Sequence, residues 1–410
     1  MFFLRKFTAA LAVAFFLFTL LSSPVGVRAD QATPAPLPDP VAKSAILIDD
    51  TNGQVLWSKD PDEHLYPAST TKILTALIAI QKGNLDDAVT IPKDAVGVEG
   101  SSIGLQLGET FTLKNLLYAL LLASSNDSAV AIADDIGGSV PAFVQMMNEE
   151  AQQLGAVNSH FANPHGLFDP NHYVTAADLA IIARAAMQNP VFREIVDTRS
   201  YTLPPRTDPK AQVDLVNHNR MLWTYPGCVG VKPGYVVKSG ETLVAAADRN
   251  GRELIAVVLD SSPTGLFSDA ASMLDYGFNA FARQEVVAPD QVLTRMPVRF
   301  GTVGVDLVAS QPVYYDFPVN VAPDVDRQVE VNEALVAPIR QGQQVGVVRL
   351  TWQGQNIGWV PVVAKQTVNR LLYADWFFWL ILVLVAASGA WFYAWRGLAR
   401  RGKVYRLRRR

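Results

Sequence analysis

The chain is poor in cysteine. Its 410 residues include only Cys228, so no disulfide bond can form within it. The fold is therefore expected to be held by its hydrophobic core. Half of the residues are hydrophobic, which suffices for one large domain of about 200–250 residues and a smaller one. Cys228 itself is predicted to be a small core residue rather than a reactive thiol.

The sequence also lacks the short patterns that bind metals and nucleotides. None of the five histidines stands in an H-E-x-x-H spacing, and no P-loop or G-x-G-x-x-G run occurs. We therefore predict neither a metal site nor a cofactor. Any chemistry of this chain is expected to come from its own side chains.

Basic residues are scarce between the two ends of the chain. The whole sequence has 35 basic and 38 acidic residues, but three of the basic residues lie before residue 30 and eight lie after residue 395. The intervening part keeps 24 basic against 38 acidic residues, a net charge of about −14. An acidic surface is a poor match for nucleic acid, so no nucleic-acid partner is predicted.

Both ends of the chain carry hydrophobic runs. Residues 1–29 combine Arg5 and Lys6, an apolar run and a small-residue cleavage site, as in a secretory signal peptide; a retained anchor is the alternative. Residues 376–395, WFFWLILVLVAASGAWFYAW, contain no charge and have tryptophan at both ends. They predict a transmembrane helix rather than a buried core helix. The basic tail 396–410 should stay cytoplasmic, with the remainder outside a single-pass membrane protein.

The composition divides the region between these ends into four segments. Residues 30–41 are a proline-rich linker. Residues 42–282 have hairpin patterns around Asn52-Gly53 and Asn250-Gly251, with a mostly helical insertion between them. Within this region TTKILTALIAIQKG predicts a buried helix ending near Gly83, Thr175 is the predicted N-cap of a helix that runs to Met187, and residues 268–282 predict a closing helix. Residues 283–365 show the short alternating runs of a small β-domain, and 366–375 form a juxtamembrane segment.

The start of the buried helix carries the first catalytic candidates. In PASTTK, Ser69 and Lys72 are three residues apart, so one helical turn brings both side chains to the same face. A lysine that enters an apolar helix should have a lowered pKa, and a neutral amine beside a hydroxyl is a general base beside a nucleophile. The helix start also offers a free backbone N–H to an oxyanion. The alternative is an ordinary helix start with Lys72 reaching water.

Two further polar stretches are candidates. SSND, residues 124–127, interrupts two apolar helices, and its buried hydroxyls and amide need partners. The alternative there is simple N-capping by Ser125 or Asn126. VKPGYVV, residues 231–237, places Lys232 before Pro-Gly, which on its own signals a surface turn.

Taken in order, these three stretches resemble the S-x-x-K, S-x-N and K-T-G signature of the serine penicillin-recognising enzymes. AILIDDTNGQVLWSKDPDEHLYPASTTKILTAL, LLLASSNDSAVAIAD and FANPHGLFDPNHYVTAADLAIIAR also resemble low-molecular-mass D-alanyl-D-alanine carboxypeptidases, over about residues 42–282. The resemblance implies an α/β (α+β) fold. A β-lactamase-like antiparallel sheet is flanked by helices, with a mostly helical subdomain, followed by a small all-β domain and the transmembrane helix.

The resemblance also implies a reaction and its three catalytic residues. Ser69 would attack the carbonyl between the two terminal D-alanines of a peptidoglycan stem peptide and form an acyl-enzyme, which water then hydrolyses. Lys72 would take the serine proton, and Ser124 would relay it to the leaving D-alanine. β-Lactams, which mimic the D-Ala-D-Ala end, would trap Ser69.

Four further residues would bind the substrate, again by resemblance. Asn126 would hold the substrate amide, and Lys232 would attract the terminal carboxylate. Gly234 would let the substrate backbone approach the strand closely. The backbone N–H of Tyr235 would complete, with that of Ser69, the oxyanion hole. His165, in the stretch NPHGL, would lie near the cleft in a structural role.

The third motif departs from the family at Pro233, where the family has threonine or serine. A hydroxyl that would bond the substrate carboxylate is missing. A hydrogen bond to a charged group contributes about 1.5–3 kcal/mol, so carboxylate binding should weaken by about one to two orders of magnitude. The departure motivates an alternative, a catalytically impaired wall-binding or β-lactam-sensing protein. A β-lactamase is a weaker alternative, since no E-x-x-L-N stretch lies between the second and third motifs.

Overall fold

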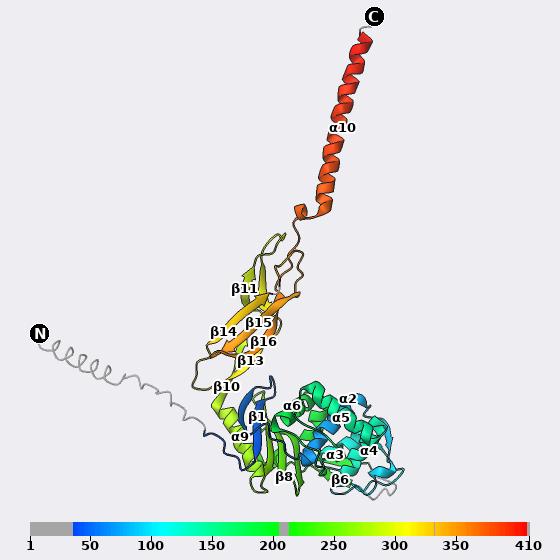
Figure 1. Ribbon diagram of the computed structural model, residues 1–410, viewed down its shortest axis with the longest axis vertical. Coiled ribbons are helices and arrows are strands. Elements are labelled where there is room, and N and C mark those ends of the chain that lie inside the picture. Colours follow the sequence, from blue (N-terminus) through cyan, green and yellow to red (C-terminus); the bar gives the residue numbers. More distant parts are fainter. Residues whose placement is uncertain (1–35, 205–212, 332, 408–410) are drawn as a thin grey trace, which may run out of the picture. The chain divides into compact units, whose positions relative to one another are not determined.

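The computed structural model describes residues 36–204, 213–331 and 333–407 (Figure 1). The predicted signal peptide, residues 1–29, and the first residues of the predicted linker lie outside these ranges. The three motifs all lie within them.

The first part of the chain is built on a five-stranded antiparallel sheet with the strand order β2-β1-β9-β8-β7. Two hairpins supply four of the five strands, with their turns at the Asn-Gly pairs 52–53 and 250–251, as predicted. The strands are β1 (Ser44–Asp49), β2 (Val55–Lys59), β7 (Cys228–Val236), β8 (Gly240–Arg249) and β9 (Arg252–Ser261). β7 is an edge strand, so one side of its backbone has no neighbour in the sheet.

The two faces of this sheet are covered by different helices (Figure 1). Because side chains alternate along a strand, Ile46 and Ile48 of β1 pack into the core of the helical subdomain, whereas Ala45 and Leu47 pack against α9 (Leu266–Ala280). The small α8 (Met221–Thr224) contributes Met221 to the second core. The sequence pattern placed α9 at residues 268–282, two residues too far along the chain.

The helical subdomain lies between β2 and β7 in the sequence. Its elements are η1 (Ala68–Thr71), α2 (Lys72–Lys82), β3 (Ala88–Thr90), η2 (Lys93–Ala95), β4 (Thr110–Thr112), α3 (Leu113–Leu121), α4 (Asn126–Gly137), α5 (Val140–Leu154), α6 (Ala176–Met187), α7 (Pro190–Asp197), β5 (Ser200–Leu203) and β6 (Val213–Val216). The predicted cap of α6 is confirmed, since the Thr175 hydroxyl accepts a hydrogen bond from the Asp178 backbone N–H at 3.0 Å.

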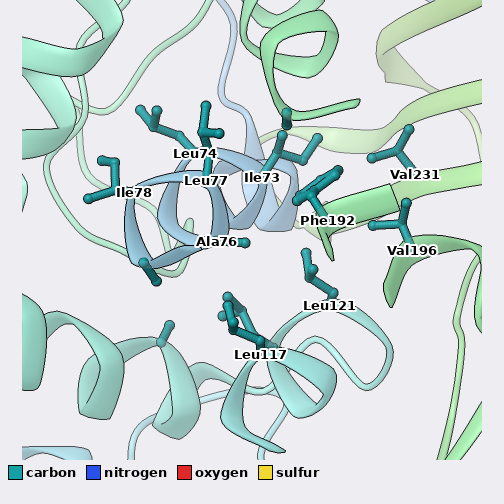
Figure 2. Packing of buried hydrophobic residues seen from close by; sticks show 14 of the residues in the cluster. Ile73, Leu74, Ala76, Leu77, Ile78, Leu117, Leu121, Phe192, Val196 and Val231 are labelled. Carbon is teal, nitrogen blue, oxygen red and sulfur yellow. The ribbon is translucent and has the colours of Figure 1, made fainter. Parts of the chain in front are cut away.

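Helix α2 is the centre of this subdomain (Figure 2). It ends at the predicted Gly83, and its residues from Lys72 to Ala79 are all buried. Leu117 and Leu121 of α3 lie along one side of it, and Phe192 of α7 and Val231 of β7 lie near its first turn (Figure 2). A helix enclosed by apolar side chains in this way holds its N-terminal residues in a fixed position relative to β7.

The second part of the chain is all β. A five-stranded antiparallel sheet has the order β11-β12-β16-β15-β14, and β10 pairs with β13. The strands are β10 (Phe281–Val287), β11 (Val292–Met296), β12 (Val305–Ala309), β13 (Val313–Pro318), β14 (Val325–Val331), β15 (Gln344–Trp352) and β16 (Gln355–Ala364). They share a separate core of valine, leucine and aromatic side chains. The expected boundary between residues 282 and 283 falls inside β10.

After the short η3 (Leu372–Ala374), the chain forms α10 (Trp376–Leu407). The 23 residues Trp376–Leu398 have a mean hydropathy of 2.0, are long and apolar enough to cross a bilayer, and are not buried by other described residues. The helix begins at the predicted residue but continues beyond Trp395. Arginine, lysine, leucine and alanine are good helix formers, so the backbone helix need not end where the apolar run ends.

Candidate active site

The stretch PASTTK folds as the 3₁₀ turn η1 followed directly by the first residue of α2, Lys72. A 3₁₀ helix has three residues per turn, so side chains at positions i and i+3 lie one above the other. The Lys72 amine and the Ser69 hydroxyl are accordingly in contact, with Nζ and Oγ 3.0 Å apart. The contact predicted from their spacing is confirmed.

Lys72 is completely buried, which contradicts the alternative in which it reaches water. In addition to its contact with Ser69, the Lys72 Nζ donates to Asn126 Oδ1 at 2.7 Å and to the carbonyl oxygen of His165 at 2.6 Å. Burial lowers the pKa of Lys72 well below its ordinary value; the charge of Lys232 lowers it further, and Asp127 opposes this effect. A neutral amine beside the hydroxyl is what a general base requires.

The second motif serves two purposes. Ser125 caps α4, since its hydroxyl accepts from the Ser128 backbone N–H at 3.3 Å. Asn126 instead joins the lysine network, and its Nδ2 donates to the carbonyl oxygen of Glu99 at 2.6 Å. Ser124 has a left-handed backbone with φ of 59°. Within the described residues its hydroxyl makes no hydrogen bond, and the side chain lines the cavity beside Ser69.

The third motif lies on β7 and is not a surface turn. Lys232 is fully buried, its Nζ donates to the carbonyl oxygen of Pro233 at 3.2 Å, and burial lowers its pKa to about 7. Pro233 stands on an edge strand, where a missing backbone N–H is tolerated. Pro233 lines the cavity, so the cavity wall lacks the hydroxyl that a threonine or serine would provide at this position.

Gly234 is required by a contact that the sequence does not reveal. A Cβ at this position would lie 2.6 Å from the backbone nitrogen of Ser69 and 2.7 Å from Thr242 Oγ1. Strand β7 therefore packs directly on the backbone of the turn that carries Ser69. The next residue, Tyr235, is more than half exposed and also lines the cavity.

These elements enclose a cavity of about 420 Å³. Four predicted site residues line it, Ser69, Ser124, Gly234 and Tyr235, together with Pro233, where the third motif departs from the family. Among the described residues, its walls do not include Lys72, Asn126 or Lys232, which lie behind them. Further residues that the motifs did not indicate complete the walls: Ser101, His218, Arg220, Glu241, Pro263, Leu266 and Phe267.

The surroundings of His165 and Cys228 do not favour a chemical role for either side chain. The His165 carbonyl oxygen accepts the hydrogen bond from Lys72, and His165 Nδ1 accepts one from the Leu167 N–H at 3.2 Å. Burial lowers the pKa of the His165 imidazole to about 3. This neutral ring fits the expected structural role. Burial raises the pKa of the Cys228 thiol to about 11, so a reactive thiolate is not favoured.

The burial of Lys232 has a consequence for stability that depends on pH. Its folded pKa of about 7 lies below the value of an exposed lysine, so between these two values the unfolded chain binds more protons. The contribution of Lys232 to the free energy of unfolding therefore increases with pH above about 7. We expect the unfolding midpoint of the parent protein to increase relative to Lys232→Met between pH 7 and pH 9.5. Parallel thermal or urea unfolding curves check this, and a constant difference would contradict it.

A hydroxyl in contact with a buried amine, set at the edge of a sheet and beside a cavity, is the site of a serine-type hydrolase. Comparison with known proteins then specifies the family. A family model described as D-alanyl-D-alanine carboxypeptidase matches residues 30–263, and one described as penicillin-binding protein 5, C-terminal domain, matches residues 281–370. The chain belongs to the D-alanyl-D-alanine carboxypeptidase family and is a serine-type carboxypeptidase.

The regions that match known relatives cover most of this chain and most of each relative. D-alanyl-D-alanine carboxypeptidase DacF of Bacillus subtilis is 34% identical over 337 residues, 80% of this chain and 86% of the relative. D-alanyl-D-alanine carboxypeptidase DacC of Escherichia coli is 31% identical over 369 residues, 86% and 90% of the two chains. The crystal structure of penicillin-binding protein 5 from Haemophilus influenzae matches with a TM-score of 0.71 and 28% identity, covering 82% of this chain and 99% of the other. The predicted fold class is confirmed.

Proposed function

We propose that this protein removes the terminal D-alanine from peptidoglycan stem peptides through an acyl-enzyme on Ser69, and that β-lactams inhibit it by acylating the same residue. The observation that carries the proposal is the contact between the Ser69 hydroxyl and the buried amine of Lys72, at 3.0 Å. The relatives named as D-alanyl-D-alanine carboxypeptidases support the choice of substrate.

In the proposed reaction, Lys72 takes the proton of Ser69 while the hydroxyl attacks the carbonyl carbon of the penultimate D-alanine. The backbone N–H groups of Ser69 and Tyr235 bind the resulting oxyanion. Ser124, whose hydroxyl makes no hydrogen bond within the described residues and whose side chain lines the cavity, passes the proton to the leaving nitrogen. Water then attacks the ester, which releases the shortened peptide and restores Ser69.

The substrate-binding residues act on either side of this step. Asn126, fixed between Lys72 and the Glu99 carbonyl, orients the substrate amide. Gly234 keeps β7 against the nucleophile turn and leaves room for the peptide backbone. Lys232 adds positive potential from behind the wall, beside the carboxylate.

The direct test is D-alanine release from a synthetic pentapeptide ending in D-Ala-D-Ala, with and without penicillin. The parent protein should release D-alanine, penicillin should stop the release, and a fluorescent penicillin should label the protein. Ser69→Ala should abolish release and labelling together. Labelling that persists in Ser69→Ala would refute the assignment of the nucleophile, and a folded parent protein with neither activity would refute the enzymatic proposal.

The second candidate function is a catalytically impaired wall-binding or β-lactam-sensing protein, and Pro233 on the cavity wall favours it. We expect Pro233→Thr to raise kcat/KM for the pentapeptide about tenfold, because the new hydroxyl can donate to the substrate carboxylate. Steady-state D-alanine release measures this effect. An unchanged or lower value would show that the missing hydroxyl does not limit the enzyme, and labelling by penicillin without any D-alanine release would favour the sensing function.

The proposed location rests on the hydrophobic segments near both ends of the sequence. The C-terminal apolar helix suggests a membrane anchor. We propose that the N-terminal segment exports the chain and that α10 holds it as a single-pass protein, with the catalytic domain outside the cytoplasm and near its polymeric substrate. Cell fractionation followed by protease treatment of spheroplasts tests this arrangement, since only an external domain would be digested.

A further inference from the structure

The charge that faces the cavity does not come from the three motifs. The ionisable side chains on its walls are those of His218, Arg220, Tyr235 and Glu241. Burial and the nearby lysines lower the pKa of His218, so its imidazole is neutral near pH 7. Arginine stays protonated at any such pH. Among the described residues, Arg220 is therefore the cation of the cavity wall.

The backbone around Arg220 is held by hydrogen bonds that involve two asparagine side chains. Asn217 donates its Nδ2 to the Val196 carbonyl at 3.1 Å and accepts from the Asn219 N–H at 2.9 Å. Asn219 Oδ1 in turn accepts from the N–H of Met221 at 3.1 Å. The exposed guanidinium of Arg220 has no hydrogen-bond or ion-pair partner in the part of the chain that the structure describes. A guanidinium without a partner among the described residues, on a fixed backbone, is suited to bind an anion.

The side chains of Lys232 and Pro233 present no donor to such an anion at the cavity wall. Pro233 offers neither a hydroxyl nor an N–H, and Lys232 turns its amine to the Pro233 carbonyl instead of the cavity. Glu241, paired with Tyr235 in the β7–β8 ladder, is the acidic residue on the wall, and the field of Arg220 stabilises its carboxylate against the effect of burial. Arg220 thus already acts on one carboxylate in this cavity.

We infer that the guanidinium of Arg220 binds the terminal carboxylate of the peptide directly and supplies the hydrogen bonds that Pro233 cannot. This inference rests on the proposed function, because the carboxylate belongs to the leaving D-alanine. It makes Arg220 a substrate-binding residue for peptides with a free C-terminal carboxylate, with Lys232 as a second, buried charge. The negative charge of Glu241 repels an anion in the cavity and should limit the affinity for the carboxylate.

Binding can be measured without turnover in full-length Ser69→Ala protein. The two probes are an acetylated tripeptide ending in D-Ala-D-Ala and the same peptide with a C-terminal amide, each titrated by calorimetry at pH 7. Adding Arg220→Gln should weaken binding of the acid about 10- to 100-fold and change binding of the amide by less than about threefold. Arg220→Lys should retain part of the preference, since it keeps the charge but loses the forked donors.

Three further variants control this experiment. Arg199→Gln removes an exposed arginine that packs over Trp223 and does not line the cavity, so the acid should bind as before. Glu241→Gln should tighten binding of the acid, because it removes the like charge. Pro233→Thr added to Arg220→Gln should restore part of the lost affinity.

Equal binding of acid and amide before the Arg220 change would overturn the inference, and so would equal losses for both probes or no binding of either. D-alanine release by the parent protein is a separate measurement that tests the proposed function independently of this binding site. If the parent releases no D-alanine but the acid preference depends on Arg220, the proposed function fails and the binding site stands. If D-alanine is released and Arg220→Gln leaves the preference unchanged, the site alone is wrong.

Discussion

Replacing Lys72 with methionine should lower the rate of D-alanine release by about 10²- to 10⁴-fold, the usual contribution of a general base. Methionine is close to lysine in length and suits the fully buried position, but it cannot accept the proton of Ser69. Lys72→Arg should fail as well, because a guanidinium stays charged and cannot act as a base. The same decrease is expected in the rate of labelling by fluorescent penicillin.

The matched control is Lys82→Arg, at the last residue of the same helix, where the side chain is exposed. It should react like the parent protein. Thermal unfolding distinguishes a lost base from a lost fold: Lys72→Met leaves Asn126 Oδ1 and the His165 carbonyl without their donor, so some loss of stability is expected, but the variant should still unfold cooperatively above the assay temperature. A Lys72→Met protein that keeps more than about a tenth of the parent rate would show that another group takes the proton.

Gly234→Ala should reduce acylation of Ser69 by about 100-fold, the typical cost of displacing reacting groups by about 1 Å. The added Cβ would lie 2.6 Å from the backbone nitrogen of Ser69 and 3.1 Å from that of Thr70. Neither backbone atom can move without moving the turn itself, so β7 must shift away from η1. Overpacking of this kind also costs about 1–3 kcal/mol of stability.

Labelling kinetics with penicillin and the urea midpoint measure the two effects of this substitution. Gly389→Ala serves as the control, since nothing lies within 4 Å of the position of its Cβ in α10. It should change neither quantity. Full activity in Gly234→Ala would mean that β7 does not press on the nucleophile turn as closely as these distances require.

The sequence was most informative where function depends on neighbours along the chain. The contact of Ser69 with Lys72 follows from a three-residue spacing, and the capping of α4 by Ser125 follows from a serine before a helix start. The hairpins were found from two Asn-Gly pairs between apolar runs. In each case the physical cause acts over one turn of the backbone, so the local pattern contains it.

The remaining site residues depend on contacts between distant segments. Glu241 reaches the cavity because the β7–β8 register pairs it with Tyr235, and Arg220 reaches it from the segment before α8. No motif or periodicity marks either residue. Likewise, the family resemblance implied that Gly234 is needed for the approach of substrate, whereas the structure adds the close packing against Ser69.

The three contacts of Lys72 determine where its lone pair points. A neutral amine carries two hydrogens, and two carbonyl-type oxygens, Asn126 Oδ1 at 2.7 Å and the His165 carbonyl at 2.6 Å, can accept both. Neither acceptor can donate in return. The lone pair is then left for the third neighbour, Ser69 Oγ at 3.0 Å, whose hydroxyl must become the donor. If Lys72 is the base, as we propose, these hydrogen bonds direct proton transfer from Ser69 to Lys72 before substrate binds, and Asn126 and the His165 carbonyl orient the base.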